Sequence, residues 1–324
     1  MLAWWLCWGL SPIAAKAGLL VASDSPSAGF GDVLAYDALG NPQGSYLAGT
    51  AGALGTPLGI TFGSDGNLYI ADAGNAEVWR FNPVSGALAP FVAPGAGGLI
   101  SPDGLAFDTS GNLYVADRGG GQVLEYDGAG NLLSGGPFIP VGAGGLVSPT
   151  GLTFDSRGNL FVADAAGGQV LKYDSFGHLL NGGPLIANGT SGLKSPTALA
   201  FDNGNLYIAN VVAGVGNSAV LEYDAVGNIT TVAAGLTDPT ALALDNGGHL
   251  FVSDAGNGQV FEAPAAGGFP SVFIDSGAGG LGTPQALAFY QPPFEPVPEP
   301  TSFLMLAMAA TATAVRQWRR QPLI

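Results

Sequence analysis

Short runs of apolar residues alternate with polar turns through the interior of the chain. In the segment that begins at Pro102, three runs rich in aliphatic and aromatic residues are Leu105–Phe107, Asn112–Ala116 and Gln122–Asp127. Glycine-containing turns separate them, and a fourth, less regular run follows at Pro137–Val141. No interior segment shows the 3.6-residue apolar spacing of an amphipathic helix. The pattern therefore predicts units of four short β-strands joined by tight turns.

This four-strand unit recurs six times. The units are spaced by 45, 47, 47, 43 and 45 residues and start at Pro57, Pro102, Pro149, Pro196, Pro239 and Pro284. Four strands in such a length are typical of one β-propeller blade, a small sheet that packs against its neighbours around an axis. The sequence thus predicts an all-β propeller over residues 18–291.

The sixth unit is incomplete at its C-terminal end. Only its inner strand, Ala286–Phe289, precedes Pro292-Pro293. The missing strands are at the other end of the propeller, where Gly18–Asp24 resembles a second strand, Val33–Asp37 a third and Ser45–Ala48 a fourth. We therefore expect the two ends to pair in one composite blade that closes a six-bladed ring.

Composition agrees with this fold class and limits the function. Gly 53 and Pro 23 together make up 76 of 324 residues, while 47% of the residues are hydrophobic, which is too many for a disordered chain. Between Gly18 and Gln291, five basic side chains against 22 acidic ones leave a net charge of −17. Such a field repels phosphate backbones, so nucleic-acid binding is not expected. The only cysteine, Cys7, precedes this region, which therefore contains no disulfide.

Residues 1–17 have the features of a signal peptide. Leu2–Leu10 is a short apolar run, and Ala15-Lys16-Ala17 fits the small-x-small pattern of a signal-peptidase site. Nine apolar residues are too few for a permanent membrane helix, which needs about 20. We expect signal peptidase to cleave before Gly18.

The C-terminal segment contains three sorting-like features in order. Residues 292–300 form a proline-rich linker that ends in Pro298, Glu299 and Pro300; Thr301–Val315 carries no charge; and three arginines follow before residue 324. Fifteen helical residues extend about 22 Å, a short membrane span whose basic end would lie in the cytoplasm. We therefore expect a transmembrane helix and basic tail over residues 301–324.

This order closely resembles the PEP-CTERM sorting tail. The resemblance implies transient anchoring in the inner membrane of a Gram-negative bacterium that makes exopolysaccharide. It also implies processing by an exosortase, which would leave the protein on the cell surface or in the extracellular matrix. An ordinary C-terminal membrane anchor is the alternative.

The repeat itself resembles the NHL family and its wider kin among six-bladed propellers, which include gluconolactonase-like enzymes and streptogramin lyases. The resemblance extends over Gly18–Tyr290 and implies a fold rather than a function, because enzymes and scaffolds share this architecture. We expect a non-enzymatic binding or scaffold module without a cofactor, whose ligand is a saccharide, a peptide or a protein. The alternatives are a metal-dependent lactonase-like hydrolase or lyase, and a matrix component with no discrete ligand.

One polar side chain ends the second strand of each unit. The alignment places these side chains on the face where the loops between blades lie: Asp24, Asp72, Asp117, Asp164, Asn210 and Asp254. Because they recur, we expect them to accept hydrogen bonds from the glycine-rich turns that follow. Two lengthened loops on this face place Phe30, Val211 and Val212 where partner contacts or tolerated insertions could lie.

Asp103 departs from the repeat. The corresponding residues of the other units are Leu58, Thr150, Thr197, Thr240 and Gln285. Gluconolactonase-like enzymes use an Asp in a similar Pro-Asp-Gly segment, with a Glu and an Asn from other blades, to hold a divalent metal. Only the Asp is matched here, so Asp103 is a candidate ligand for a divalent cation, which in the case of Ca²⁺ takes six to eight oxygens.

The two histidines follow the repeat. His178 and His249 stand where other units have asparagine, in turns on the opposite face. We expect both to be polar turn residues.

Overall fold

The computed structural model describes residues 18–25, 30–47, 53–133, 135–245, 247–264 and 270–290. All of them belong to the first of two compact units, Met1–Gln291, and not to the second, Pro292–Ile324. The expected signal peptide, linker, Pro298-Glu299-Pro300 motif and C-terminal helix lie outside the described residues. Within the described ranges, no helix is long and apolar enough to cross a membrane.

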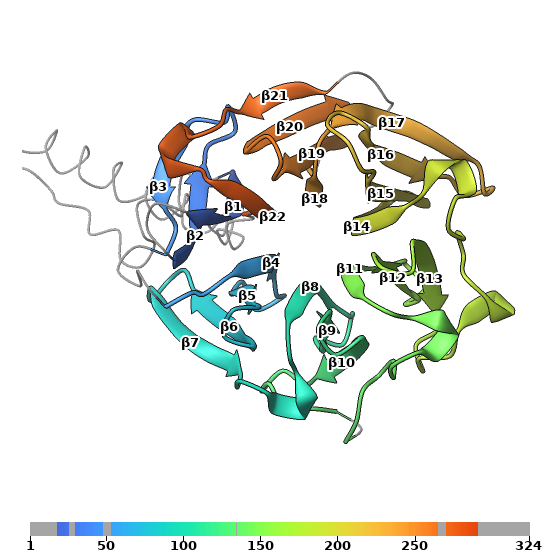
Figure 1. Ribbon diagram of the computed structural model, residues 1–324. Coiled ribbons are helices and arrows are strands. Elements are labelled where there is room, and N and C mark those ends of the chain that lie inside the picture. Colours follow the sequence, from blue (N-terminus) through green and yellow to red (C-terminus); the bar gives the residue numbers. More distant parts are fainter. Residues whose placement is uncertain are drawn as a thin grey trace, which may run out of the picture. The chain divides into compact units, whose positions relative to one another are not determined.

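Six antiparallel sheets surround a central axis, and each is one blade (Figure 1). Blade 1 contains β4 (Pro57–Phe62), β5 (Leu68–Asp72), β6 (Glu77–Asn82) and β7 (Ala87–Val92); blade 2 contains β8 (Pro102–Phe107), β9 (Leu113–Asp117) and β10 (Gln122–Tyr126); blade 3 contains β11 (Pro149–Phe154), β12 (Leu160–Asp164) and β13 (Gln169–Tyr173). Blade 4 contains β14 (Ser195–Asp202), β15 (Asn205–Val211), β16 (Ser218–Tyr223) and β17 (Ile229–Leu236); blade 5 contains β18 (Pro239–Leu244), β19 (His249–Asp254), β20 (Gln259–Pro264) and β21 (Ser271–Ile274). The predicted all-β six-bladed propeller is confirmed.

Blade 6 joins the two ends of the propeller, as expected. Its sheet has the order β22 (Thr283–Phe289), β1 (Leu19–Ser25), β2 (Phe30–Tyr36) and β3 (Pro42–Ser45). Leu19 pairs with Phe289, and Val21 pairs with Leu287. Because the β1 side chains Leu19, Leu20 and Val21 are at most 1% exposed, both faces of this strand belong to the core.

Two boundaries in blade 6 differ from expectation. The outer strand is Pro42–Ser45 rather than Ser45–Ala48, and the loop expected at Ser25–Asp32 is partly strand, since β1 extends to Ser25 and β2 begins at Phe30. The strands extend further because Ser23, Asp24 and Ser25 continue the antiparallel pairing with β2 beyond the apolar run.

Blades 2 and 3 have three-stranded sheets. Where a fourth strand would lie, only isolated bridges form: Val123–Ile139 and Tyr126–Leu132 in blade 2, and Val170–Ile186 and Tyr173–Leu179 in blade 3. Prolines flank Ile139 on both sides in the sequence Pro137-Phe138-Ile139-Pro140. Because proline has no backbone N–H to donate, a longer ladder cannot form there. The irregular run expected at Pro137–Val141 agrees with this arrangement.

Five short 3₁₀ turns complete the described secondary structure. They are η1 (Ala96–Gly98), η2 (Ala143–Gly145), η3 (Leu180–Gly182), η4 (Thr190–Gly192) and η5 (Ala278–Gly280). Hydroxyls of buried tyrosines bind to three of them: Tyr126 donates to the Ala96 carbonyl, Tyr173 to that of Ala143 and Tyr36 to that of Ala278, at 2.7–2.8 Å. These contacts join the third strand of a blade to the loop that precedes it.

The inner strands of neighbouring blades pack closely around the axis. A side chain at Gly59 would collide with the carbonyl oxygen of Asp103, and one at Gly104 with that of Thr150. Further along the axis, six aliphatic side chains at equivalent positions line a narrow channel: Ile60, Leu105, Leu152, Leu199, Leu242 and Leu287. Equivalent residues of the six inner strands therefore fill most of the centre of the disk.

Threonine hydroxyls link three pairs of adjacent blades. Thr150 donates to the Pro196 carbonyl at 3.1 Å, Thr197 to the Pro239 carbonyl at 2.6 Å and Thr240 to the Pro284 carbonyl at 2.8 Å. These bonds join blades 3 to 4, 4 to 5 and 5 to 6. They place the threonines at the axis, where the candidate site lies.

Candidate binding site at the propeller axis

The polar residue that ends each second strand fixes the segment that enters the same blade. Asp164 pairs with Pro149, and its carboxylate accepts hydrogen bonds from the backbone N–H groups of Val147 and Ser148 at 3.2 and 2.8 Å. It also accepts from the backbone of Gly167 at 3.2 Å, which is the bond to the following turn that the sequence predicted. Equivalent bonds to the entering segment are made by Asp72, Asp117, Asn210 and Asp254.

In blade 6 this position belongs to Ser23, and the alignment that placed Asp24 there is wrong by one residue. Leu19 pairs with Phe289 as Leu113 pairs with Phe107, so Ser23 falls opposite Pro284. The Ser23 hydroxyl accepts the hydrogen bond from the backbone of the entering segment, 3.0 Å from the Gly282 nitrogen. Asp24 is the next residue, and burial together with repulsion from Asp72 raises the pKa of its carboxyl.

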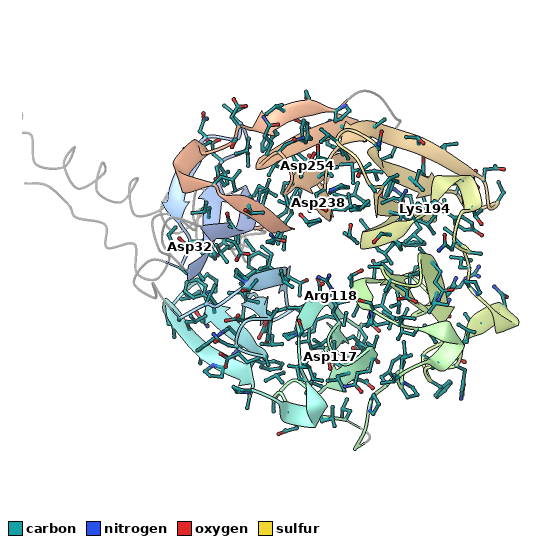
Figure 2. All side chains as sticks on the ribbon, viewed as in Figure 1. Asp32, Asp117, Arg118, Lys194, Asp238 and Asp254 are labelled. Carbon is teal, nitrogen blue, oxygen red and sulfur yellow. The ribbon has the colours of Figure 1, made fainter. Side chains whose placement is uncertain are left out.

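A cavity of about 270 Å³ opens at the axis on this face of the disk. The residue after the proline of every inner strand lines it: Leu58, Asp103, Thr150, Thr197, Thr240 and Gln285. The rest of the lining comes from the ends of second strands and from the segments that enter the blades: Arg118, Ala165, Val211, Ser195 and Asp238. Arg118 and Asp238 lie on opposite sides of the axis (Figure 2).

Asp103 and Arg118 form the charged part of this cavity. The Asp103 side chain is 17% exposed, and one of its carboxylate oxygens lies 3.8 Å from Arg118 Nη1. Burial raises the pKa of Asp103 to about 6, although the Arg118 charge opposes this rise. Burial and the neighbouring Asp254 also raise the pKa of Asp238. The cavity thus presents a cation, two carboxyls that become protonated more readily than usual, and several hydroxyls.

These residues do not fit a divalent cation. Across the described part of the chain, no three His, Cys, Asp or Glu side chains are close enough to share a metal ion. Asp103 faces a guanidinium, and the threonines at equivalent positions donate their protons to proline carbonyls. A hard cation needs several more oxygen ligands than one paired carboxylate offers.

The remaining candidate residues occupy different places. Val211 ends β15 and lines the cavity, while Val212 begins the lengthened loop and its backbone N–H donates to the Ser218 hydroxyl at 3.1 Å. Phe30 begins β2, and its side chain lies outside what the structure describes. Within the described loop, Val215 is the most exposed apolar residue at 86%.

His178 lies in a turn, as expected, whereas His249 follows its turn directly and begins β19. The His178 and His249 rings lie 3.3 and 3.0 Å from the carboxylates of Asp174 and Asp245, respectively, in the same place as the asparagines of other turns. Neither histidine lines the axial cavity. The Asp245 carboxylate raises the pKa of His249.

Sequence reasoning missed Arg118 and Asp238. Arg118 is the residue after the polar position that ends the second strand, and the equivalent residues are Asp24, Ala73, Ala165, Val211 and Ala255. Arg118 therefore departs from the repeat in the same blade as Asp103, and this coincidence was a usable signal. Asp238 also departs from the repeat, because the residue before the inner-strand proline is a serine or threonine in the other units: Thr56, Ser101, Ser148, Ser195 and Thr283.

One protein-family model matches part of the chain. Residues 41–138 match the model of the SMP-30/gluconolactonase/LRE-like region. This segment covers about a third of the chain and includes Asp103 and Arg118. No curated protein matches the chain significantly.

Solved structures share the fold at low sequence identity. A chain of the Nidogen/Laminin complex is 17% identical with a TM-score of 0.67, over 85% of this chain and 98% of that one. A streptogramin B lyase is 12% identical with a TM-score of 0.54, over 82% and 85% of the two chains. Virginiamycin B lyase from Staphylococcus aureus is 13% identical with a TM-score of 0.52, over 67% and 69%. The similarity covers binding proteins and enzymes alike, so it establishes the fold alone.

Proposed function

We propose that this chain is an exported, non-enzymatic binding module of a bacterial cell envelope or extracellular matrix. In this proposal the axial cavity takes part of a polypeptide partner. The composition of the cavity supports the proposal most directly, because a few polar groups there stand against aliphatic surface, as in binding pockets generally. The Nidogen/Laminin complex gives an example of a protein with this fold in a complex with another protein.

A polypeptide suits the lining better than a saccharide. Arg118 offers a partner for a carboxylate, and Asp103 and Asp238 offer partners for a basic side chain. Exposed Ile100 and Val147, 58% and 57% accessible, lie in the segments that enter blades 2 and 3 on the same face and add apolar contact area. None of the described lining residues is aromatic, so a sugar ring has no flat apolar surface on which to stack.

Selection of peptides against the full-length chain tests this function. We expect peptides that bind saturably, and we expect Arg118→Gln to weaken their binding by about tenfold, since a charge-assisted contact is lost. Arg80→Gln is the matched control, because Arg80 lies in blade 1 outside the cavity. Equal binding by the wild type and Arg118→Gln would place the partner elsewhere, and absence of any saturable peptide would refute the polypeptide hypothesis.

A hydrolase or lyase with an axial site near Asp103 is the second candidate. It is favoured by the raised pKa of about 6 at Asp103, since perturbed carboxyls gather at catalytic sites, and by the family match that includes this residue. Turnover of a lactone or streptogramin panel by the full-length chain, lost on Asp103→Asn, would support the enzyme. Stoichiometric calcium or zinc in the purified chain would support a metal-dependent enzyme and count against the binding module.

Export and sorting form a separate part of the proposal. Signal peptidase would remove residues 1–17, the helix expected at 301–324 would hold the protein in the inner membrane, and an exosortase would then process the Pro298-Glu299-Pro300 motif. Replacing these three residues by alanines should leave the protein in the inner-membrane fraction, whereas wild type reaches the surface or the medium. Normal release of the alanine variant would count against exosortase processing without affecting the binding hypothesis.

A further inference from the structure

A cleft between blades 3 and 4 contains a second group of residues that depart from the repeat. Its volume is about 330 Å³, and the β11–β12, β14–β15 and β16–β17 turns border it. These turns lie at the opposite ends of the strands from the axial cavity, and the two sites share no lining residue. Phe161, Phe201 and Leu206 provide an apolar floor.

One aromatic side chain of the repeat is replaced by a smaller one in this cleft. The equivalent cleft between blades 5 and 6, with a volume of about 320 Å³, keeps the phenylalanine as Phe273, so the replacement changes the lining of the cleft rather than creating it. In blades 1, 2 and 5 a phenylalanine packs edge-on against the aromatic residue of the second strand, with ring centroids 4.9 Å apart: Phe91 on Tyr69, Phe138 on Tyr114 and Phe273 on Phe251. Blade 3 has Leu185 at this point, in Pro184-Leu185-Ile186 where blade 2 has Pro137-Phe138-Ile139. Leucine is shorter than phenylalanine, so space remains beside Phe161.

Two of the five basic residues in the propeller line this cleft. Lys172 lies 3.0 Å from the Asp155 carboxylate and 4.5 Å from the centre of the Phe161 ring. At the position of Lys172, blades 2, 4 and 5 carry glutamates. Arg157 is exposed at the rim and forms no ion pair with any described residue. The cleft thus offers an available cation on an otherwise acidic surface.

The acidic residues of the cleft are already occupied. Asp155 accepts hydrogen bonds from Asn159 as well as from Lys172, and Asp224 accepts from the backbone and the side chain of Asn228. Tyr223, by contrast, makes no hydroxyl hydrogen bond within the described residues, although three equivalent tyrosines donate to neighbouring carbonyls. A guanidinium and a phenol therefore remain as donors above an apolar floor.

We propose that this cleft binds a carboxylate attached to an apolar ring. The ring fills the space left by Leu185 against Phe161 and Phe201, and the carboxylate accepts hydrogen bonds from Arg157 and Tyr223. A sugar acid fits less well, because its hydroxyls would lie unpaired against the floor. A free aromatic acid and the C-terminal phenylalanine of a peptide present the same chemistry.

The test compares four probes on the full-length chain by titration calorimetry and saturation-transfer NMR. The probes are 3-phenylpropionate, its neutral amide, N-acetyl-glycyl-phenylalanine and glucuronate. We expect both aromatic acids to bind saturably and the amide to bind about tenfold more weakly, because it lacks the charge that Arg157 pairs with. Tighter binding of the peptide acid would identify a polypeptide C-terminus as the source, and tighter binding of phenylpropionate would identify a free acid; either order supports the site.

Three variants locate the binding. Leu185→Phe puts a larger side chain beside Phe161, where the ring of the ligand would lie, so we expect weaker binding with an unchanged fold. Arg157→Gln should weaken binding by about tenfold while Arg157→Lys retains most of it. Arg80→Gln is the matched control. Arg80 belongs to blade 1, where it lies over Phe91, 5.7 Å from the ring centre, and Phe91 takes the position that Leu185 has in blade 3.

Several outcomes would overturn the assignment. They are unchanged affinity in a folded Leu185→Phe variant, glucuronate binding more tightly than phenylpropionate, and no saturable binding of either aromatic acid up to about 10 mM. If Leu185→Phe does not fold, Arg157→Gln decides, because that side chain is exposed and equal affinity there excludes the site. Axial variants such as Arg118→Gln should leave phenylpropionate binding unchanged, which separates this result from the proposed function.

Discussion

Removal of the Asp164 carboxylate should destabilise the propeller far more than its conversion to an amide. Asp164 is fully buried and accepts four hydrogen bonds, from three backbone N–H groups and from Gln169 Nε2. Hydrogen bonds to a charged acceptor contribute about 1.5–3 kcal/mol each, although water replaces part of this loss near a surface. We therefore expect Asp164→Ala to lower the free energy of unfolding by about 3–5 kcal/mol.

Blade 4 supplies the reason why Asp164→Asn should be mild. There Asn210 takes the same position, and its single carbonyl oxygen accepts from the backbones of Lys194 and Ser195 at 2.8 and 3.2 Å. Its amide donates to the Gly192 carbonyl at 3.1 Å. We expect Asp164→Asn to cost about 1 kcal/mol, because an amide retains the bonds to the entering segment.

Urea denaturation of the full-length chain, followed by circular dichroism, measures both changes. A loss below about 1 kcal/mol for the alanine variant would show that the entering segment holds its position without Asp164. Equal losses for the two variants would show that charge, rather than hydrogen-bond geometry, is what the site requires. Either result would refute the reasoning drawn from Asn210.

Three further predictions concern the core, the axis and the links between blades. Leu20→Ala removes a buried side chain from the blade that joins the two ends, and it should lower the free energy of unfolding by about 3 kcal/mol. Leu39 is a turn residue that is 80% exposed, so Leu39→Ala should change this free energy by less than about 0.5 kcal/mol. Burial raises the folded-state pKa of Asp103 from 3.8 to about 6. The contribution of this group to the free energy of unfolding is therefore fully present below pH 3.8 and is lost as the pH rises to about 6. Asp103→Asn should flatten the curve of unfolding free energy against pH in this range, and an unchanged slope would contradict the raised pKa. Thr197→Val should cost about 1 kcal/mol through loss of the bond to the next blade, and a neutral effect in urea denaturation would mean that this bond contributes no net stability.

Most of the fold followed from the sequence because each unit repeats its turn chemistry. Prolines mark the inner strands, and the incomplete sixth unit together with the apolar run at Leu19–Ala22 indicates the pairing of β1 with β22. The role of Ser23 was missed because the other units have aspartate or asparagine at this position. The alignment therefore matched Asp24 by residue type, whereas the strand pairing places Ser23 there, and its hydroxyl accepts the backbone hydrogen bond. Strand ends at Ser25 and Phe30 were missed since polar residues there continue the ladder.

The candidate sites were less predictable than the fold. Asp103 could be singled out because it departs from the repeat, but its nearest charge, Arg118, comes from the end of another strand and approaches only after folding. The lining of the cleft beside Leu185 comes from turns and strands of two neighbouring blades, and a sequence shows this only when the packing of the blades is known. Side-chain direction and cavity volume are properties of the assembled ring rather than of any one unit.

The threonine bonds make the disk mechanically uneven. They join blades 3, 4, 5 and 6 in series, whereas Leu58, Asp103 and Gln285 form no such bond among the described residues. Sliding of one blade against the next therefore breaks a side-chain hydrogen bond at each step from blade 3 to blade 6, but within the described residues it breaks no bond of this kind between blades 6, 1, 2 and 3. Asp103 and Arg118 both belong to blade 2, so the charged part of the axial cavity lies in the half of the ring where the described residues make none of these bonds.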